Sequence, residues 1–170
     1  ISASTVPRNY ATEYEVANPT RKGYTFTGWT KCGAGSWNSQ TNKYTFGPGA
    51  GTLTANWTPI KYNIKYELDG GVLSITNPTE YTVETETFTL NNPTKEGYIF
   101  KGWSTSLTST SSYNATMTVE KGSTGDKEFR AVWQIITYNI SYNLNGGTLT
   151  NVSNPTSYNT TTETFTLKNP

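Results

Sequence analysis

The sequence predicts a mainly β protein built from tandem small repeat modules, with little or no helix. One segment of the chain occurs twice in full and begins a third time. Several stretches alternate apolar and polar residues, which is typical of half-buried strands. The composition is rich in Thr, Ser and Asn, with 14% aromatic and 33% hydrophobic residues. This composition favours strands and turns over helices.

The repeated segment organises the chain. Residues 92–103 read NPTKEGYIFKGW, residues 18–29 read NPTRKGYTFTGW, and Asn169–Pro170 start the segment again. The tryptophans that close the two full copies, Trp29 and Trp103, lie about 74 residues apart. A fixed period of this length is the signature of a tandem array.

The repeats predict three modules. Residues 61–134 form a complete repeat, residues 1–60 a partial repeat without its first strand, and residues 135–170 a partial repeat with its first half only. A second register, with modules at 1–91 and 92–170, fits the same sequence equally well. The differences in spacing between copies fall in loops, which tolerate insertions.

Each repeat has a short alternating segment just before the organising segment. These segments are Glu13–Val16, Thr87–Leu90 and Thr164–Leu167. Their period of two over β-favouring residues predicts strands with the apolar side chains facing inward.

The organising segment itself predicts a turn followed by a strand. Pro93 and Gly97 break regular structure, and residues 98–100 (YIF) read as a strand. Strict alternation would put Trp103 on the opposite face from Phe100. The glycine before each Trp is therefore predicted to form a bulge that returns the ring to the core. We expect Trp29 and Trp103 to be largely buried.

The second half of each repeat ends in a strand. Residues 30–42 and 104–115 are Ser/Thr-rich and predict loops. The strands Leu53–Trp57 and Phe129–Trp133 follow, with alternate residues on one face.

The next repeat opens with the clearest alternation in the chain. Tyr62–Leu68 reads YNIKYEL, and Tyr138–Leu144 reads YNISYNL. Each is followed by a turn signal, Asp69-Gly70-Gly71 or Asn145-Gly146-Gly147, which predicts a tight reversal.

Charge and composition argue against several classes of protein. The net charge is +1, no basic stripe stands out and no long apolar run is present, so neither nucleic acid nor membrane insertion is expected. The chain has no His and one cysteine, Cys32. A conventional catalytic triad is therefore impossible, and the carboxylates fall on solvent-facing strand positions, so we expect no enzyme. Asp69 and Asp126 read as turn residues, and no metal or cofactor is expected.

Four residues are candidate ligand contacts. Trp37 and Tyr113 lie in the variable loops, where exposed rings could stack on sugars. Arg21 and Lys22 form a basic pair that could touch an acidic glycan. The competing interpretation is that these aromatic residues belong to the core.

The motifs YxIxYxLxGG, NPTxxGYxFxGW and AxW resemble the Listeria–Bacteroides repeat, a family that includes the internalin B-repeat. The resemblance covers essentially the whole chain. The sequence departs from the family pattern only at Thr30, which follows the first Gly-Trp pair, and at Ala55-Asn56-Trp57, where the second copy has Ala-Val-Trp. The resemblance implies small β-grasp-like modules in tandem, and it transfers no catalytic or ligand residue.

The resemblance also sets the functional expectations. It implies a non-catalytic extracellular repeat array, the stalk or spacer of an adhesin-like bacterial surface protein attached to the cell wall through a region outside this chain. The alternative is that the repeats are themselves an adhesive module that binds a host or wall glycan or protein. Besides neighbouring repeats of the same chain, a further expected partner is another copy, because an uncovered strand edge invites β-addition.

Overall fold

The structure is a computed structural model that describes residues 9–150 and 152–169. All regular elements in this part of the chain are strands, β1 to β13, arranged in several small sheets. The all-β prediction is thus confirmed for the described residues, and none of them forms a helix able to cross a membrane.

Two compact units are present. The first comprises Ile1–Tyr62, Glu80–Glu86 and Lys121–Gly125, and the second comprises Asn63–Thr79, Thr87–Glu120 and Asp126–Pro170.

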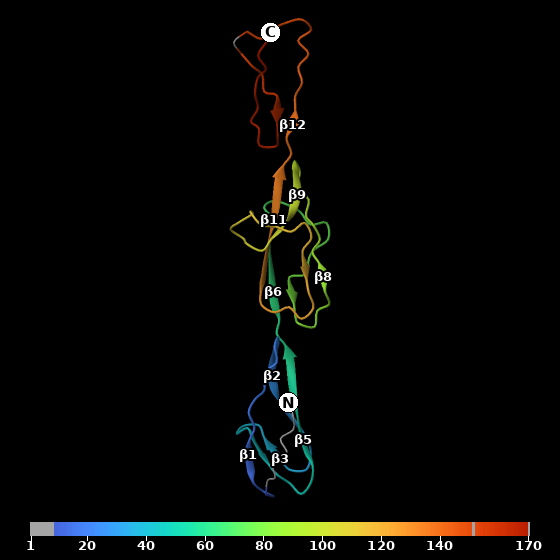
Figure 1. Cartoon of the computed structure of the whole chain (residues 1–170), viewed down its shortest axis with the longest axis vertical. Coiled ribbons are helices and arrows are strands. Elements are labelled where there is room, and N and C mark those ends of the chain that lie inside the picture. The colour runs from blue at the N-terminus through green and yellow to red at the C-terminus, as the bar shows by residue number, and fades with distance from the viewer. Residues whose placement is uncertain (1–8, 151, 170) are drawn as a thin grey trace. The chain divides into compact units, whose positions relative to one another are not determined.

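The first unit contains two small sheets. Strands β2 (Tyr24–Gly33) and β5 (Gly51–Pro59) form a long antiparallel ladder and lie side by side in Figure 1. In the other sheet, β4 (Lys43–Thr45) lies between β1 (Glu13–Glu15) and β3 (Ser36–Asn38). All neighbours in both sheets are antiparallel. In addition, β7 (Glu80–Tyr81) is assigned to this unit, where the ring of Tyr81 lies 5.5 Å from that of Tyr62.

Strand β3 corrects the prediction that residues 30–42 form only a loop. Trp37 in β3 is paired with Tyr44 in β4. The Trp37 ring also lies edge-on to Trp29, with 6.5 Å between the ring centroids. A large aromatic side chain supplies enough buried area to order a short strand within a Ser/Gly-rich stretch.

The second unit is built on β11 (Lys127–Ile135). This strand is antiparallel to β9 (Tyr98–Ser104) on one side and parallel to β6 (Tyr62–Glu67) on the other. A separate pair of short strands, β8 (Phe88–Thr89) and β10 (Thr118–Val119), is antiparallel. Parallel neighbours need a long crossover connection, and here the chain between β6 and β11 supplies it.

The core of the second unit is centred on Trp103, which is 0% exposed. The Trp103 indole N–H donates a 3.2 Å hydrogen bond to the side-chain oxygen of Asn92. The ring of Tyr66 in β6 lies 5.9 Å from that of Trp103 and 6.0 Å from that of Phe129. Other buried apolar residues of this unit are Ile64, Leu90, Val119, Ala131 and Val132. The predicted burial of Trp103 is therefore confirmed.

A β-bulge precedes each of the two repeated tryptophans, as the sequence predicts. The register between β2 and β5 shifts between Phe26 and Gly28, and the β9–β11 ladder shows the same irregularity at the corresponding place. Phe26 and Trp29 consequently share a face, with ring centroids 5.4 Å apart. The extra residue of the bulge is what reverses the direction of the tryptophan side chain.

The tight reversals are also confirmed. The Gly71 N–H donates to the Leu68 carbonyl over 2.9 Å, and the central residues Asp69 and Gly70 have φ of 49° and 83°. Two consecutive positive φ angles define the type I′ turn that DG and NG sequences favour. The Asn145–Gly146 turn repeats this geometry, with φ of 47° and 90°.

The predicted strands of the last partial repeat are mostly not formed. From Tyr138–Leu144, only β12 (Tyr138–Asn139) is a strand, and it pairs with β13 (Ser157–Tyr158). The described residues 164–167 form no strand, and Leu167 is 50% exposed where its counterpart Leu90 is 4% exposed. The physical reason is that no counterpart of β11 or β10 follows within the described residues to pair with these segments.

Alkaline pH is expected to destabilise the second unit through Tyr66. The Tyr66 hydroxyl donates a 2.8 Å hydrogen bond to the Pro78 carbonyl, and burial raises its pKa from 10.0 to about 12. The pKa of Tyr66 is higher in the folded state than in the unfolded state. The stability that this difference contributes is fully present below the unfolded-state pKa and is lost as pH rises through the folded-state pKa. After allowance for partial exposure, we expect a loss of about 1–2 kcal/mol. Urea unfolding at a series of pH values above neutrality measures it.

The variant Tyr66→Phe is the control, because it keeps the ring and removes the ionisable hydroxyl. Its free energy of unfolding should fall less steeply with pH than that of the wild type over the alkaline range. Equal slopes in the two proteins would show that another group causes the loss.

Candidate functional site

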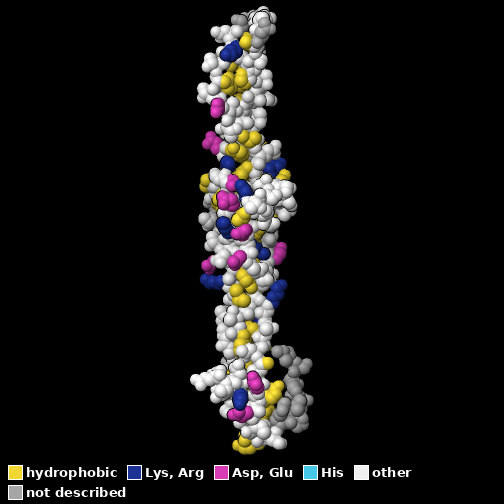
Figure 2. All heavy atoms as spheres, turned by 90° about the vertical axis from the view of Figure 1, so that its left-hand side faces the viewer, with side chains coloured by type: hydrophobic (Ala, Val, Ile, Leu, Met, Phe, Trp, Pro, Cys, Tyr) yellow, Lys and Arg dark blue, Asp and Glu magenta, His cyan; other side chains and the backbone are white. Residues whose placement is uncertain are grey.

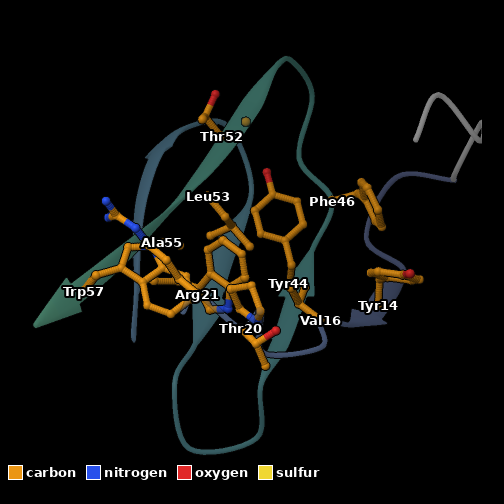
Figure 3. A pocket seen from close by; sticks show the side chains of 13 residues that line it. Tyr14, Val16, Thr20, Arg21, Tyr44, Phe46, Thr52, Leu53, Ala55 and Trp57 are labelled. Carbon is orange, nitrogen blue, oxygen red and sulfur yellow. The ribbon is translucent and has the colours of Figure 1, made fainter. Parts of the chain in front are cut away.

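A groove of about 810 Å³ opens on the first unit (Figure 3). It lies between the β2–β5 ladder and the β1–β4–β3 sheet, and residues of both sheets line it. Figure 3 shows the rings of Trp57, Tyr44 and Phe46 following one another along it. The lining residues include Tyr14, Val16, Arg21, Trp29, Tyr44, Phe46, Leu53, Ala55 and Trp57. The lining is therefore mostly apolar and aromatic.

Local strand geometry places the groove residues. Alternation along β5 turns Leu53, Ala55 and Trp57 to one face, where each is half-buried, and the residues between them are exposed. Tyr44 is 8% exposed, and its hydroxyl donates to the Ala34 carbonyl over 2.5 Å. The bulge in β2 brings Trp29 to the same groove.

The same positions are more deeply buried in the second repeat. Leu53 and Ala55 correspond to Phe129 and Ala131, which are 3% and 1% exposed. Trp29 is only half-buried, whereas Trp103 is fully buried. Trp29 is therefore less completely buried than Trp103, although the sequence predicts the same burial for both. In the second repeat β6 covers these positions, and no described residue takes the place of β6 beside β5.

Two indole N–H groups in this unit have no hydrogen-bond acceptor. The Nε1 atoms of Trp29 and Trp37 are both buried and without a partner among the described residues. The Nε1 atom of Trp103, by contrast, donates to Asn92. A buried donor without an acceptor costs about 1–3 kcal/mol. The aromatic cluster of the first repeat therefore contains two buried indole donors without an acceptor among the described residues.

The four candidate ligand contacts are not gathered in one place. Arg21 lines the groove, and its guanidinium carbon lies 3.6 Å from the centre of the Tyr24 ring. Trp37 is half-buried against Trp29, and the exposed Lys22 is not part of the lining. Tyr113, 42% exposed, belongs to the second unit. The structure therefore joins only Arg21 directly to the groove.

A partly buried ion pair lies in the second unit. The Arg130 guanidinium makes two bonds to the Asp69 carboxylate, at 2.6 and 3.1 Å, which raise the pKa of Arg130, and it also donates to the Leu107 carbonyl. On the face shown in Figure 2, Lys and Arg side chains are interspersed with Asp and Glu. The described part of the chain contains no group of three or more His, Cys, Asp or Glu arranged to hold a metal.

Most groove residues were not among the sequence-based candidates. Val16, Phe46, Leu53 and Trp57 look like ordinary core positions, because their spacing matches strand faces. Their exposure depends on which strand lies beside β5, because β6 covers the matching positions of β11 and no described residue covers β5 in that way. Spacing within the segment gives no signal of it.

The antiparallel ladder of β2 with β5 recurs in the second repeat as that of β9 with β11, each with a bulge before the tryptophan. A family model, the Listeria-Bacteroides repeat domain, matches residues 2–56 and 62–132. The chain belongs to the Listeria-Bacteroides repeat family. Its two matched copies each contain one full occurrence of the repeated segment, at residues 18–29 and 92–103, so the resemblance seen in the sequence is confirmed.

Two curated relatives show distant similarity to this repeat protein. Internalin H of Listeria monocytogenes is 37% identical over 92 residues, which is 52% of this chain and 16% of the relative. A protein of Evansella cellulosilytica named as a Gly-rich membrane protein is 27% identical over 139 residues, 76% of this chain and 16% of the relative. The chain thus spans 16% of the length of each relative. No solved structure matches it.

Proposed function

We propose that this Listeria-Bacteroides repeat chain is a non-catalytic segment of an extracellular array on the bacterial surface. It acts as a spacer that holds other domains of a longer protein away from the cell wall. Membership of the family and the similarity to Internalin H support the surface location. The observation that carries the spacer role is a close glycine contact between repeats that occurs at corresponding positions, at Gly23 and again at Gly97.

The first joint lies within the first unit and connects Gly23 and Tyr24 of the first repeat to residues 80–86 of the second. A Cβ atom added at Gly23 would lie 2.1 Å from Cγ1 of Val83. The Tyr24 hydroxyl donates a 2.8 Å hydrogen bond to the Glu84 carboxylate, which raises the pKa of Tyr24. The Ile60 N–H donates to the Gly23 carbonyl over 2.9 Å. Only a residue without a side chain fits here.

The second joint lies within the second unit and repeats this arrangement one period later. A Cβ atom added at Gly97 would lie 2.0 Å from the side chain of Thr160, and the Ile136 N–H donates to the Gly97 carbonyl over 2.9 Å. Lys95 Nζ lies 4.1 Å from the centre of the Tyr98 ring, as Arg21 lies over Tyr24 in the first joint. A joint at the corresponding positions of each period would give successive repeats one fixed spacing, which a spacer requires.

Replacing Gly23 with alanine is expected to loosen the first joint. The new methyl group must displace Val83, so the Tyr24–Glu84 hydrogen bond should also be lost. Spin labels on the exposed native Cys32 and on Glu128→Cys, also exposed, report the distance between the first and second repeats. Pulsed electron resonance should give one narrow distance distribution for the labelled parent and a distribution at least about twofold broader for Gly23→Ala.

Gly146→Ala is the matched control. Gly146 has φ of 90°, close to the 77° of Gly23, but no heavy atom of the described residues lies within 4 Å of its added Cβ. The control should keep the narrow distribution, and Val83→Ala should partly restore it in the Gly23→Ala background. A parent protein without one dominant distance would contradict the spacer proposal.

We further propose module boundaries near residues 60 and 134, or in the alternative register near residue 91. The boundary near residue 60 fits the short connector between β5 and β6, the one near 134 falls at the end of β11, and the alternative near 91 falls between β8 and β9. A β-grasp-like module is supported by the mixed sheet in which β6 and β11 are parallel neighbours.

An adhesive role is the second candidate function. It is favoured by the open aromatic groove with Arg21 at its border and by the exposed ring of Tyr113. The partner would be a host or wall glycan or protein. Saturable binding to a glycan array that persists at raised salt and falls in Trp57→Ala, which removes a ring that lines the groove, would favour adhesion. Binding that disappears with salt would indicate only weak attraction by Arg21 and Lys22.

A further inference from the structure

The tight turn that follows β6 contains an Asp-Gly pair, Asp69–Gly70. In such a pair the backbone nitrogen of the glycine can attack the side-chain carbon Cγ of the aspartate. A nitrogen–carbon bond forms, a carbon–oxygen bond of the carboxyl group breaks, and that oxygen leaves as water. A second water then opens the resulting succinimide ring to aspartate or to isoaspartate. Glycine favours the reaction because it has no side chain to hinder the attack.

The carboxylate of Asp69 is held by Arg130 of β11. The Nε and Nη2 atoms of Arg130 donate to its two oxygens over 2.6 and 3.1 Å, and the two side chains are 28% and 29% exposed. A planar guanidinium that binds both oxygens at once fixes the direction of the carboxylate. Arg130 is fixed in turn, because it also donates to the Leu107 carbonyl over 2.6 Å. While this ion pair lasts, Cγ of Asp69 is not free to rotate toward the Gly70 nitrogen.

The backbone of the turn is restrained as well. Lys95 Nζ donates to the Asp69 carbonyl over 2.7 Å. The Leu68 carbonyl accepts from the Gly71 N–H over 2.9 Å and from the Trp133 indole N–H over 3.0 Å. Ring closure needs new backbone and side-chain dihedral angles at the aspartate, so the turn must open first. Since the chemical step is slow compared with local opening, its rate follows the population of the open turn.

We propose that Asp69 is a site of spontaneous isoaspartate formation whose rate is set by the ion pair with Arg130. The intact pair keeps the carboxylate bound and the turn closed. Each opening of the pair exposes Cγ to the Gly70 nitrogen. This inference goes beyond the spacer role, because it concerns how long the backbone of the second repeat stays chemically unaltered.

Isoaspartate at residue 69 should release the loop at 104–115. The reaction adds a methylene group to the main chain and displaces the carboxylate, so Arg130 loses the partner that holds it beside Leu107. The far end of the loop pairs with the core, because Asn114 exchanges backbone hydrogen bonds of 2.8 and 3.0 Å with Trp103. Hydrogen exchange of the 104–115 peptide should therefore be faster in the isoaspartate form.

Peptide mass spectrometry of the full chain, incubated at neutral pH and physiological temperature, tests the proposal. Arg130→Gln removes the guanidinium and keeps a polar side chain. It should accumulate isoaspartate at residue 69 on the order of 10-fold faster than the wild type, because two bonds to a charged, partly exposed group are lost. A succinimide form, lighter by one water, should precede the isoaspartate.

Val119→Ala is the matched control. Val119 lies in β10 of the same unit and is 2% exposed, so its truncation destabilises the unit and leaves the ion pair in place. Urea unfolding compares the stability of the variants, and residue 69 of Val119→Ala should convert at close to the wild-type rate. Arg130→Lys keeps the positive charge without the planar fork and should convert at an intermediate rate, which covers the case in which Arg130→Gln does not fold.

Two results would overturn the proposal. One is conversion of residue 69 in the Arg130 variants no faster than in the wild type. The other is an equal acceleration in Val119→Ala, which would show that general instability of the unit sets the rate. Unchanged hydrogen exchange of the 104–115 peptide in the separated isoaspartate form would refute the release of the loop.

Discussion

Replacing Trp103 with alanine will remove about 3–5 kcal/mol from the stability of the second unit. Trp103 is 0% exposed, and it contacts the rings of Tyr66 and Phe100 at 5.9 and 5.5 Å. Its indole N–H also satisfies the side-chain oxygen of Asn92. The substitution leaves a cavity at the centre of the core and an unsatisfied polar group beside it. Hydrogen exchange of peptides from β9 and β11 measures the free energy of opening in this unit.

The first repeat supplies the comparison, because Trp29 occupies the equivalent position after an equivalent bulge. Trp29 is half-buried, and its Nε1 atom has no partner among the described residues. Trp29→Ala should therefore cost only about 1–2 kcal/mol, since less burial is lost and an unsatisfied donor is removed. Equal losses in the two units would show that the covering strand β6 does not determine the energetic role of the repeated tryptophan.

Features encoded within a few residues could be predicted from the sequence. The bulge before each Trp follows from the spacing of Phe100, Gly102 and Trp103, and the type I′ turn follows from Asp69-Gly70. Both depend on local backbone geometry that a glycine or an aspartate makes favourable. The alternation of β5 likewise follows from the residues of β5 alone.

Features that depend on a distant partner could not be predicted in the same way. Trp29 and Trp103 stand in nearly the same local sequence, yet only Trp103 is covered, because burial requires β6 beside β11. Tyr138–Leu144 alternates like β6 but forms only a short strand, since no parallel neighbour is present among the described residues. The groove was missed for this reason, because the exposure of its lining depends on what lies beside β5.

Replacing Gly102 with alanine is expected to destabilise the second unit by at least about 3 kcal/mol. Gly102 has φ of 147°, and an added Cβ atom would lie 2.3 Å from the backbone oxygen of Asn114. A backbone atom cannot rotate away as a side chain can, so the segment at Asn114 must move. That segment exchanges two backbone hydrogen bonds with Trp103, of 2.8 and 3.0 Å. The substitution should therefore weaken the β-bulge between β9 and β11 and, at the same time, displace Trp103 from the centre of the core.

Gly28→Ala separates the steric effect from the conformational one. Gly28 occupies the same bulge in the first repeat with φ of 124°, and no heavy atom of the described residues lies within 4 Å of its added Cβ. Only the cost of a positive φ, about 1–2 kcal/mol, should then appear. Hydrogen exchange on peptides from β2 and β9 compares the two variants within one fold. If both lost the same free energy, backbone conformation alone would account for the glycine, and the contact with Asn114 would have no energetic role. If only Gly102→Ala opened its unit, the bulge glycine would serve mainly to let the 104–115 segment close over the core.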